Sequence, residues 1–411
     1  MKFFLLFFPL FLYAESLKSL IEFATNTNEL ISSKNLKVKA KKSEVTSSEN
    51  ELFPTIDVGA YYQRSDDPSP FMSGTTYSGY AKIGYDLYTG GKKSNVIKQK
   101  TNEFKSSKYD FFSTKNSIEL AIVQDFYNIK SAEAKLFARE EASKAVEAQL
   151  IRMQKFYKAS LATSDDVDRL QSAYDSNIYA IETLKFEILS LKKSLELKVG
   201  KEINSLDSSK FQKVDDTHSD DLDGIKSLKA IKDSIVYQSE IIDSYYYPQL
   251  RLEDTYSLYG YADEPSIASI PIKQITNQNK LMATLNFRVV DFGVLSEAKK
   301  SVLLQAEALN EQIKYQTKEQ KLQLELAQHR IKTAKLNIKS AASALKSGNS
   351  ALKTITQKYN SGIVDNVVYL DALSSQTDAK ARYETSLNNL ELAYALYYFY
   401  NAKKLQEYLN D

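Results

Sequence analysis

The sequence predicts a mixed α/β membrane protein made of two tandem repeats. Three observations support this: landmarks that recur at one offset, four segments that alternate apolar and polar residues, and two very long segments without helix breakers. Gly turns lie at Tyr88-Thr89-Gly90-Gly91 and at Val290-Asp291-Phe292-Gly293. In each repeat 66 positions separate the last Gly from a Tyr, at Tyr157 and at Tyr359. A constant offset of 202 residues between both pairs of landmarks indicates a tandem duplication.

A targeting segment begins the chain. Met1-Lys2 is a short charged start, Phe3 to Tyr13 is an apolar run, and Ala14-Glu15 offers a cleavage point. The run is shorter than a spanning helix and predicts a signal peptide over residues 1–14, with an N-terminal membrane anchor as the alternative. No later stretch approaches the length of a spanning helix, so the mature chain is expected to lack one.

Four segments have the period of β-strands. They are Thr55 to Gln63, Tyr77 to Tyr88, Leu250 to Tyr261 and Leu281 to Val290. Their length and alternation are typical of tilted outer-membrane strands. An antiparallel sheet with one face in water gives the same alternation and remains the alternative. If the strands span a membrane, several chains must contribute them, because four strands cannot close and an open edge cannot face lipid.

The remaining segments predict helices. The two longest run from Gly91 to Tyr157, without Pro or Gly between, and from Gly293 to Tyr359, with only Gly348 between. Each is roughly 100 Å long at 1.5 Å per residue. Returning helices are predicted over 167–199 and 368–409, and shorter helices over 17–51 and 222–247. Such helices are stable only when packed side by side. A cytoskeletal coiled coil would account for the helices but not for the strands.

Composition excludes several functions. With 54 Lys+Arg against 52 Asp+Glu there is no basic stripe for nucleic acid. The chain has no Cys, two His and four Met, and no residues at catalytic spacing, so neither an enzyme nor a metal or other cofactor is expected. A calcium-loop interpretation of Asp215 to Asp223 fails at both anchor positions, Ser219 and Ala230, which leaves a polar linker. Asp291-Phe292-Gly293 has none of the partner motifs of a kinase.

Corner and turn motifs recur in both repeats. The helix-to-strand corners are Phe53-Pro54 and Tyr247-Pro248, and the strand-to-helix corners contain Gly90, Gly91 and Gly293. The turns between long helices read Tyr157-Lys158-Ala159-Ser160-Leu161 with Asp166-Val167, and Tyr359-Asn360-Ser361-Gly362-Ile363 with Leu370-Asp371-Ala372. In this order the motifs resemble the TolC-type outer-membrane efflux protein family. The structural turn residues on this interpretation are Pro54, Gly90, Gly91, Pro248, Gly293 and Gly362.

The resemblance implies a homotrimer, in which a 12-stranded β-barrel in the outer membrane continues into a long 12-helix α-barrel in the periplasm. Repeat 1 would cover residues 15–205, a polar or equatorial linker 206–224, and repeat 2 225–411. The implied function is a passive exit duct for small molecules or polypeptides in a tripartite efflux or type I secretion system. Its partners would be a periplasmic adaptor, an inner-membrane pump and outer-membrane lipid. The alternative is a structural or adhesive surface protein with a coiled-coil stalk.

The resemblance also implies a gate at the helix turns. Asp371 matches an aspartate that lines the family's constriction, Tyr359 matches a linking tyrosine, and Asp166, beside Asp165, matches its partner. Val368 and Val364 replace a second aspartate and a linking arginine, which predicts a looser closure or one held by Asp365 and Asn366. The alternatives are a solvated helix-face residue for Asp371 and helix N-capping for Asp165 and Asp166.

Overall fold

The computed structural model describes residues 15–66, 73–213, 220–262, 266–267, 270–271 and 273–410. Its contacts divide the chain into two compact units. The sheet unit contains residues 36–109 and 226–314, and the helical unit contains the rest. The predicted signal peptide, residues 1–14, and residues 214–219 of the predicted linker lie outside the described residues.

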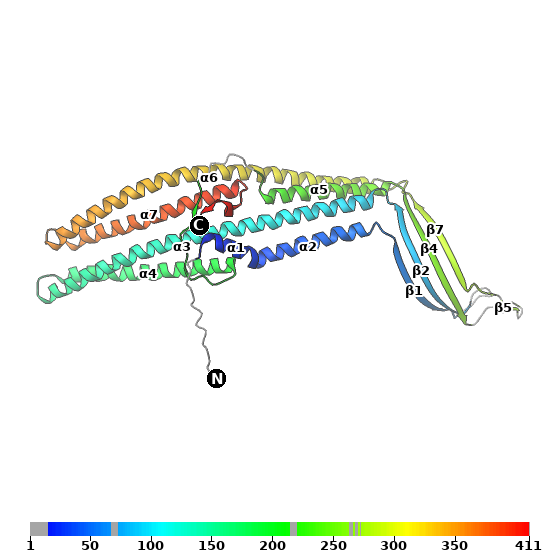
Figure 1. Cartoon of the computed structure of the whole chain (residues 1–411), viewed down its shortest axis with the longest axis horizontal. Helices are drawn as coiled ribbons and strands as arrows, with labels where there is room; N and C mark the ends of the chain where they lie inside the picture. Colours follow the sequence, from blue (N-terminus) through cyan, green and yellow to red (C-terminus); the bar gives the residue numbers. More distant parts are fainter. Residues whose placement is uncertain are drawn as a thin grey trace, which may run out of the picture. The chain divides into compact units, whose positions relative to one another are not determined.

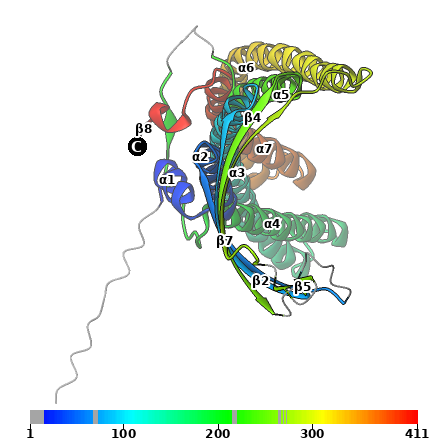
Figure 2. The ribbon, with the colours of Figure 1, turned by 90° about the vertical axis from the view of Figure 1, so that its right-hand side faces the viewer.

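Four antiparallel strands form the main sheet of the sheet unit, in the order β1-β2-β4-β7 (Figure 1 and Figure 2). They are β1 (Thr55–Arg64), β2 (Thr75–Tyr88), β4 (Gln249–Ala262) and β7 (Asn277–Asn286). The four predicted strands are confirmed, but the last was predicted over Leu281 to Val290 and spans Asn277–Asn286, four residues earlier at both ends. The reason is pairing: β4 starts at Gln249, opposite Asn286, directly after Pro248, so later residues find no partner strand. Two short strands, β5 (Ser266–Ile267) and β6 (Ile270–Pro271), pair with each other and follow β4 in the chain before β7 begins.

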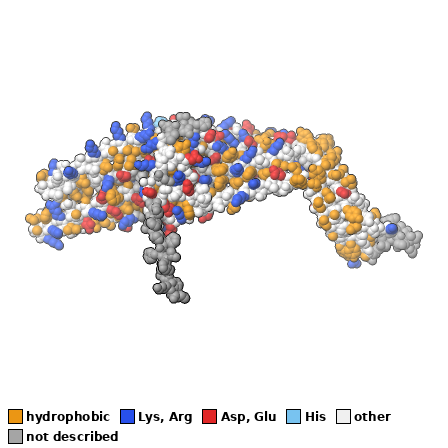
Figure 3. Space-filling view, viewed as in Figure 1, with side chains coloured by type: hydrophobic (Ala, Val, Ile, Leu, Met, Phe, Trp, Pro, Cys, Tyr) orange, Lys and Arg blue, Asp and Glu red, His pale blue; other side chains and the backbone are white. Residues whose placement is uncertain are grey.

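The two faces of the main sheet differ in polarity. The apolar side chains of one face are exposed, with Ile56 72%, Val58 82% and Leu285 66% exposed. Figure 3 shows hydrophobic side chains gathered over the strands. The other face carries charged side chains that form cross-strand ion pairs: Lys82 with Asp57 and Glu253, and Arg251 with Asp86 and Glu253. A sheet in a water-soluble protein covers its apolar face with a core. Here the apolar face is uncovered.

Glycines make the sharp corner after β2. Gly90 and Gly91 have φ angles of 63° and 85°, which side chains with a Cβ rarely adopt. A Cβ on Gly90 would also lie 2.5 Å from the Ser244 carbonyl oxygen. The corner after β7 has Gly293 at φ 87°, preceded by Phe292, which takes a positive φ of 52° and is 98% exposed.

Short helices lead into the sheet at two prolines. In the first repeat α2 (Glu29–Asn50) precedes Pro54 and β1, and in the second α5 (Asp223–Asp243) and η1 (Ser244–Tyr246) precede Pro248 and β4. Within the sheet unit α2 pairs with the start of α3 through Lys41 and Glu103, whose Nζ and Oε2 are 2.9 Å apart. Proline fits both corners because it fixes an extended backbone and cannot continue a helix.

Two helical hairpins, whose first helices begin in the sheet unit, form most of the helical unit. One consists of α3 (Lys92–Lys158) and α4 (Ser164–Val199), and the other of α6 (Val294–Asn360) and α7 (Asn366–Tyr400) (Figure 1). Both long helices are confirmed to within one residue of their predicted limits. No helix in the described part of the chain offers a stretch that could span a membrane.

The expected helix over 17–51 is wrong at one point. It is divided into α1 (Leu17–Thr27) and α2 at Asn28. The Asn28 Oδ1 accepts from the N–H groups of Leu30 and Ile31, and its Nδ2 donates to the Lys198 carbonyl at 2.8 Å. An asparagine that caps one helix and holds the end of another makes the break favourable.

The last helix is also shorter than the predicted 368–409. α7 ends at Tyr400, where Ala402 takes a left-handed φ of 56° and the Lys403 N–H donates to the Tyr398 carbonyl at 2.9 Å. This is the hydrogen-bond pattern of a helix C-cap. The chain then forms η2 (Leu405–Tyr408) and β8 (Leu409–Asn410).

The main core lies in the helical unit. It collects apolar side chains from α1, α3, α4, α6, α7 and the terminal segment; its fully buried members include Leu17, Ile122, Phe126, Ile129, Leu195 and Tyr398. The described start of the linker also belongs to it. There β3 (Lys210–Phe211) pairs with β8, and the Phe211 N–H donates to a Glu391 carboxylate oxygen at 2.7 Å. Leu206 and Phe211 therefore join this part of the linker to the core.

Gly90→Ala is expected to destabilise the sheet unit by about 1–3 kcal/mol, because the new Cβ meets Ser244 in a left-handed backbone. The control is Gly79→Ala within β2, where nothing lies within 4 Å of an added Cβ. Thermal unfolding of the purified protein, followed by circular dichroism, measures both. Equal midpoints for the two variants would contradict the corner assignment.

A buried carboxyl group gives the fold a pH dependence. Glu119 on α3 is 3% exposed, and its Oε1 accepts from Gln406 Nε2 at 3.3 Å. Burial raises the pKa of Glu119 to about 7, against the opposing charges of Lys115 and Lys404. The folded state holds the Glu119 proton more tightly than the unfolded state does. The protonated carboxyl group therefore contributes its full stabilisation of the folded state below pH 4.5, and this contribution is lost as pH rises to about 7.

Glu119→Gln should remove this pH dependence. In the wild-type protein it changes the free energy of unfolding by about 3 kcal/mol at most. The measurement is the free energy of unfolding of wild type and variant between pH 4.5 and 8. Glu22→Gln, at an exposed position of α1, should keep the wild-type slope. An unchanged slope in Glu119→Gln would show that Glu119 is ionised in the folded protein throughout this range.

Candidate functional site at the helix turns

The turns that join the long helices to their returning partners have the same backbone geometry. After α3, Ser160 has φ 61° and the Leu161 N–H donates to the Phe156 carbonyl at 2.8 Å. After α6, Gly362 has φ 70° and the Ile363 N–H donates to the Lys358 carbonyl at 2.9 Å. Both ends match a helix C-cap that needs a left-handed residue. Ser160 therefore carries strain that Gly362 avoids.

Capping side chains fix the start of each returning helix. At α4 the Thr163 side chain accepts from the Asp166 N–H, and the Asp166 carboxylate accepts from the Thr163 N–H. At α7 the Asp365 Oδ1 accepts from the Val368 N–H at 3.0 Å. The capping alternative is thus confirmed for Asp166. Asp165 instead forms an ion pair with Arg169 on the same helix, at 2.9 Å.

Polar contacts connect the two hairpins at these turns. The Asn366 Nδ2 donates to the Asp166 carbonyl at 3.2 Å and to its Oδ1 at 3.3 Å. The Arg152 Nη1 donates to the Asn360 Oδ1 at 2.6 Å. Of Asp365 and Asn366, the two residues predicted to hold the closure, Asn366 contacts the other hairpin, whereas Asp365 caps α7. Arg152 was not predicted. The position of Asn360 beside Tyr359 was the only local signal for that second link.

Tyr359 lies in a small apolar cluster rather than in the polar link. We call Ala142, Val146, Leu150, Leu170, Tyr359, Tyr369 and Leu373 the tip cluster; all are buried and come from both hairpins. The rings of Tyr359 and Tyr369 stack at 4.9 Å. The Tyr359 hydroxyl is buried and has no hydrogen-bond partner within the described residues. Burial raises the pKa of Tyr359, and the negative charge of Asp166 raises it further, against Arg152.

Asp371 differs from the other predicted gate residues because its side chain is exposed on α7. Tyr369, two residues earlier, is buried in the tip cluster, so the two side chains lie on different faces of the helix. Val364, at the position of the family's linking arginine, packs against the tip cluster. The structure therefore joins Asp166 and Asn366, buries Tyr359 in the tip cluster and leaves the Asp371 side chain exposed.

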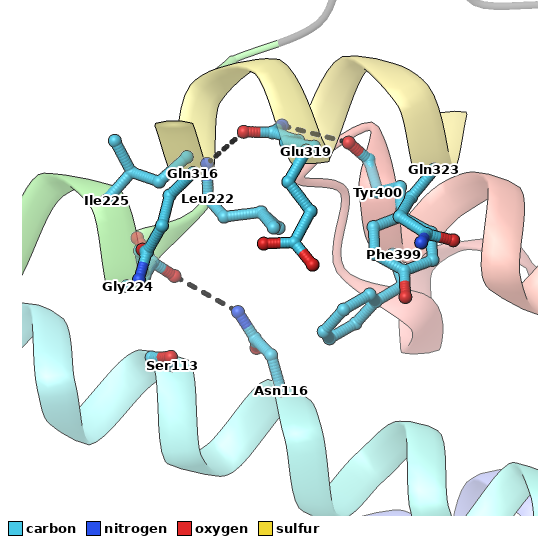
Figure 4. Close-up of a pocket in the computed structure, with 12 residues that line it drawn as sticks. Ser113, Asn116, Leu222, Gly224, Ile225, Gln316, Glu319, Gln323, Phe399 and Tyr400 are labelled. Carbon is cyan, nitrogen blue, oxygen red and sulfur yellow. Dashed lines mark hydrogen bonds between the residues drawn. The ribbon is translucent and has the colours of Figure 1, made fainter. Parts of the chain in front are cut away.

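A second polar feature of the helical unit is a cavity of about 250 Å³ between α3, the start of α5, α6 and the end of α7 (Figure 4). The Asn116 Nδ2 donates to the Asp223 Oδ2 at 3.0 Å, and the Gln320 Nε2 donates to the Tyr400 carbonyl at 2.9 Å. Figure 4 shows Glu319 lying between these groups. Within the described ranges no three His, Cys, Asp or Glu residues are grouped to hold a metal ion. The cavity's polar groups join the helices that surround it.

Residues 20–195 match a family model described as outer membrane efflux protein. This part of the chain is therefore similar to members of that family. The predicted resemblance and the predicted outer-membrane localisation, with extension into the periplasm, are thereby confirmed. Members of the outer membrane efflux family are channels and not enzymes, which agrees with the expectation from composition. None of the curated protein sequences matches the chain.

Solved structures of outer-membrane channels have a similar fold over 94% to 95% of this chain. The CmeC outer membrane channel of Campylobacter jejuni has a TM-score of 0.83 at 13% identity, covering 94% of this chain and 85% of its own. The outer membrane protein VceC of Vibrio cholerae has a TM-score of 0.81 at 13% identity, covering 95% and 96%. A membrane protein from Pseudomonas aeruginosa has a TM-score of 0.80 at 15% identity, covering 94% and 93%.

A double-mutant cycle with Asn366→Ala and Asp166→Asn tests the link between the hairpins. We expect a coupling energy of about 1 kcal/mol, because the Asn366 amide donates to the Asp166 carboxylate at a largely buried position. The measurement is the unfolding free energy of the four proteins. Asp165→Asn is the matched control, since Asp165 pairs with Arg169, and its coupling to Asn366 should be near zero. Equal coupling in both cycles would contradict the proposed link.

Proposed function

We propose that this chain is one protomer of a passive outer-membrane exit duct, with its helices in the periplasm. Three copies would close twelve strands into one barrel and twelve helices into a continuing tunnel. The first repeat would comprise residues 15–205, the second 225–411, and the linker 206–224. The role as an efflux duct is supported by the family match and by the fold of the efflux channels.

The observation that carries the proposal is the inverted polarity of the main sheet. Its exposed apolar face, represented by Ile56 and Leu285, suits hydrocarbon, and its ion-paired face, with Lys82 and Arg251, suits a water-filled lumen. Within the described strands, β1 and β7 are the edges of the sheet. In lipid such edges need partner strands, because their backbone N–H and C=O groups cannot bond to water. Further copies of the chain would supply these partners.

We propose that the helix turns form the gate of this duct. In a trimer three Asp371 carboxylates would converge, which would attract cations and repel anions. Asp166, bound by Asn366, would hold the two hairpins of each protomer together, with Tyr359 buried behind them and Asp165 at the rim. Since Val364 adds apolar contact in place of an ionic link, closure would depend on packing more than on charge.

The duct has no energy source of its own in this proposal. An inner-membrane pump would supply it, and a periplasmic adaptor would dock on the helix turns. The exported substrate would be a small molecule or a polypeptide, in a tripartite efflux or a type I secretion system.

Single-channel conductance in a planar bilayer tests both the duct and the gate. Wild-type protein should give a small current that prefers cations, and Asp371→Ala should give a larger current or one with weaker cation preference. Asp233→Ala, at an exposed position of α5, is the control and should behave as wild type. Folded protein without any current would contradict the duct. A current that does not respond to Asp371 would keep the duct and remove the gate.

A further inference from the structure

A groove between the two hairpins of the helical unit is not used by the proposed duct. It lies between α3 and α4 on one side and α6 and α7 on the other, and its volume is about 660 Å³. This volume is within the range of sites for drug-sized molecules. The helix turns, with Asp371 and Tyr359, are not part of its lining.

The groove carries an excess of positive charge. Three cationic side chains line it, Lys135, Arg139 and Arg382, against one carboxylate, that of Asp378. The Arg139 Nη2 lies 3.4 Å from the Asp378 Oδ1, so one cation and the carboxylate offset each other. The Arg382 Nη2 donates to the neutral Asn337 Oδ1 at 3.3 Å. In the part of the chain that the structure describes, neither Lys135 nor Arg382 has a carboxylate partner.

Apolar side chains supply the rest of the lining. Tyr179, which is 77% exposed, lines the groove together with Leu184 and Ala381. Unpaired guanidinium and ammonium groups select anions, and guanidinium binds carboxylate, sulfonate and phosphate with paired hydrogen bonds. An apolar wall next to them favours a ligand with a hydrophobic body.

We propose that this groove binds soluble organic anions, namely molecules that carry a carboxylate, sulfonate or phosphate on an aromatic or aliphatic body. Arg382 and Lys135 would hold the anionic group, and Tyr179 and Leu184 would contact the body. The preference is opposite in sign to that expected of an Asp371 ring. Binding in the groove does not depend on transport, so it can be measured whether or not the protein conducts ions.

Equilibrium dialysis of the full-length protein in a non-ionic detergent tests the proposal. The probe is radiolabelled naphthalene-2-sulfonate, and naphthalene-2-methylamine serves as a cation of similar size. We expect saturable binding of one sulfonate per chain and no saturable binding of the amine. Arg382→Gln should weaken sulfonate binding roughly fivefold, as expected for one charge-assisted contact at a partly exposed site.

Two further variants separate the groove from general charge effects. Asp378→Asn removes the one carboxylate among the described lining residues and should strengthen sulfonate binding, whereas Arg330→Gln, an exposed Arg of α6 outside the groove, should leave sulfonate binding unchanged. Circular dichroism confirms that each variant is folded. The proposal is overturned if folded wild-type protein does not bind the sulfonate, binds the amine as well, or if Arg382→Gln and Arg330→Gln have equal effects.

Discussion

A 67-residue helix cannot bury its own apolar stripe, and this constraint governs the helical part of the molecule. The stripe must be covered by other segments along its length. In the helical unit two clusters do this. The main core draws on segments far apart in the sequence, from Leu17 near the N-terminus to Leu409 near the C-terminus. The tip cluster buries apolar side chains of both hairpins near the helix turns, among them Leu170 and Tyr359.

The main core also includes the described parts of the linker and the C-terminal segment. Tyr398 is fully buried, stacks on Tyr408 at 4.1 Å and donates through its hydroxyl to the Gln212 carbonyl. Glu391 is buried as well and accepts from the Phe211 N–H; burial raises the pKa of this carboxyl group. Polar groups in this core are therefore placed to satisfy backbone donors and acceptors that would otherwise be unpaired.

In the sheet unit, unlike in the helical unit, apolar side chains are exposed rather than buried in a core. Its apolar side chains, such as Val58, are exposed, while charged groups such as Lys82 and Glu253 neutralise one another across strands. This arrangement is unfavourable in water and favourable where one face meets hydrocarbon and the other meets water.

Charge is distributed unevenly in the helical unit too. Asp166 is engaged in capping and in contact with Asn366, Asp371 is exposed, and the groove beside Arg382 is basic.

The sequence by itself determined the order of the elements, the two long helices, the four strands and the glycine and proline corners, because these depend on local periodicity and backbone preference. It could not place the end of β7, which is set by where β4 begins, nor the break at Asn28, which is stabilised by a carbonyl of distant Lys198. At the candidate site the family resemblance paired Asp166 with Tyr359 and left Asp365 and Asn366 as the alternative. Only the tertiary structure decided that Asn366 bonds to Asp166, because it places the Asn366 amide within hydrogen-bond distance of Asp166 and buries Tyr359 in the tip cluster.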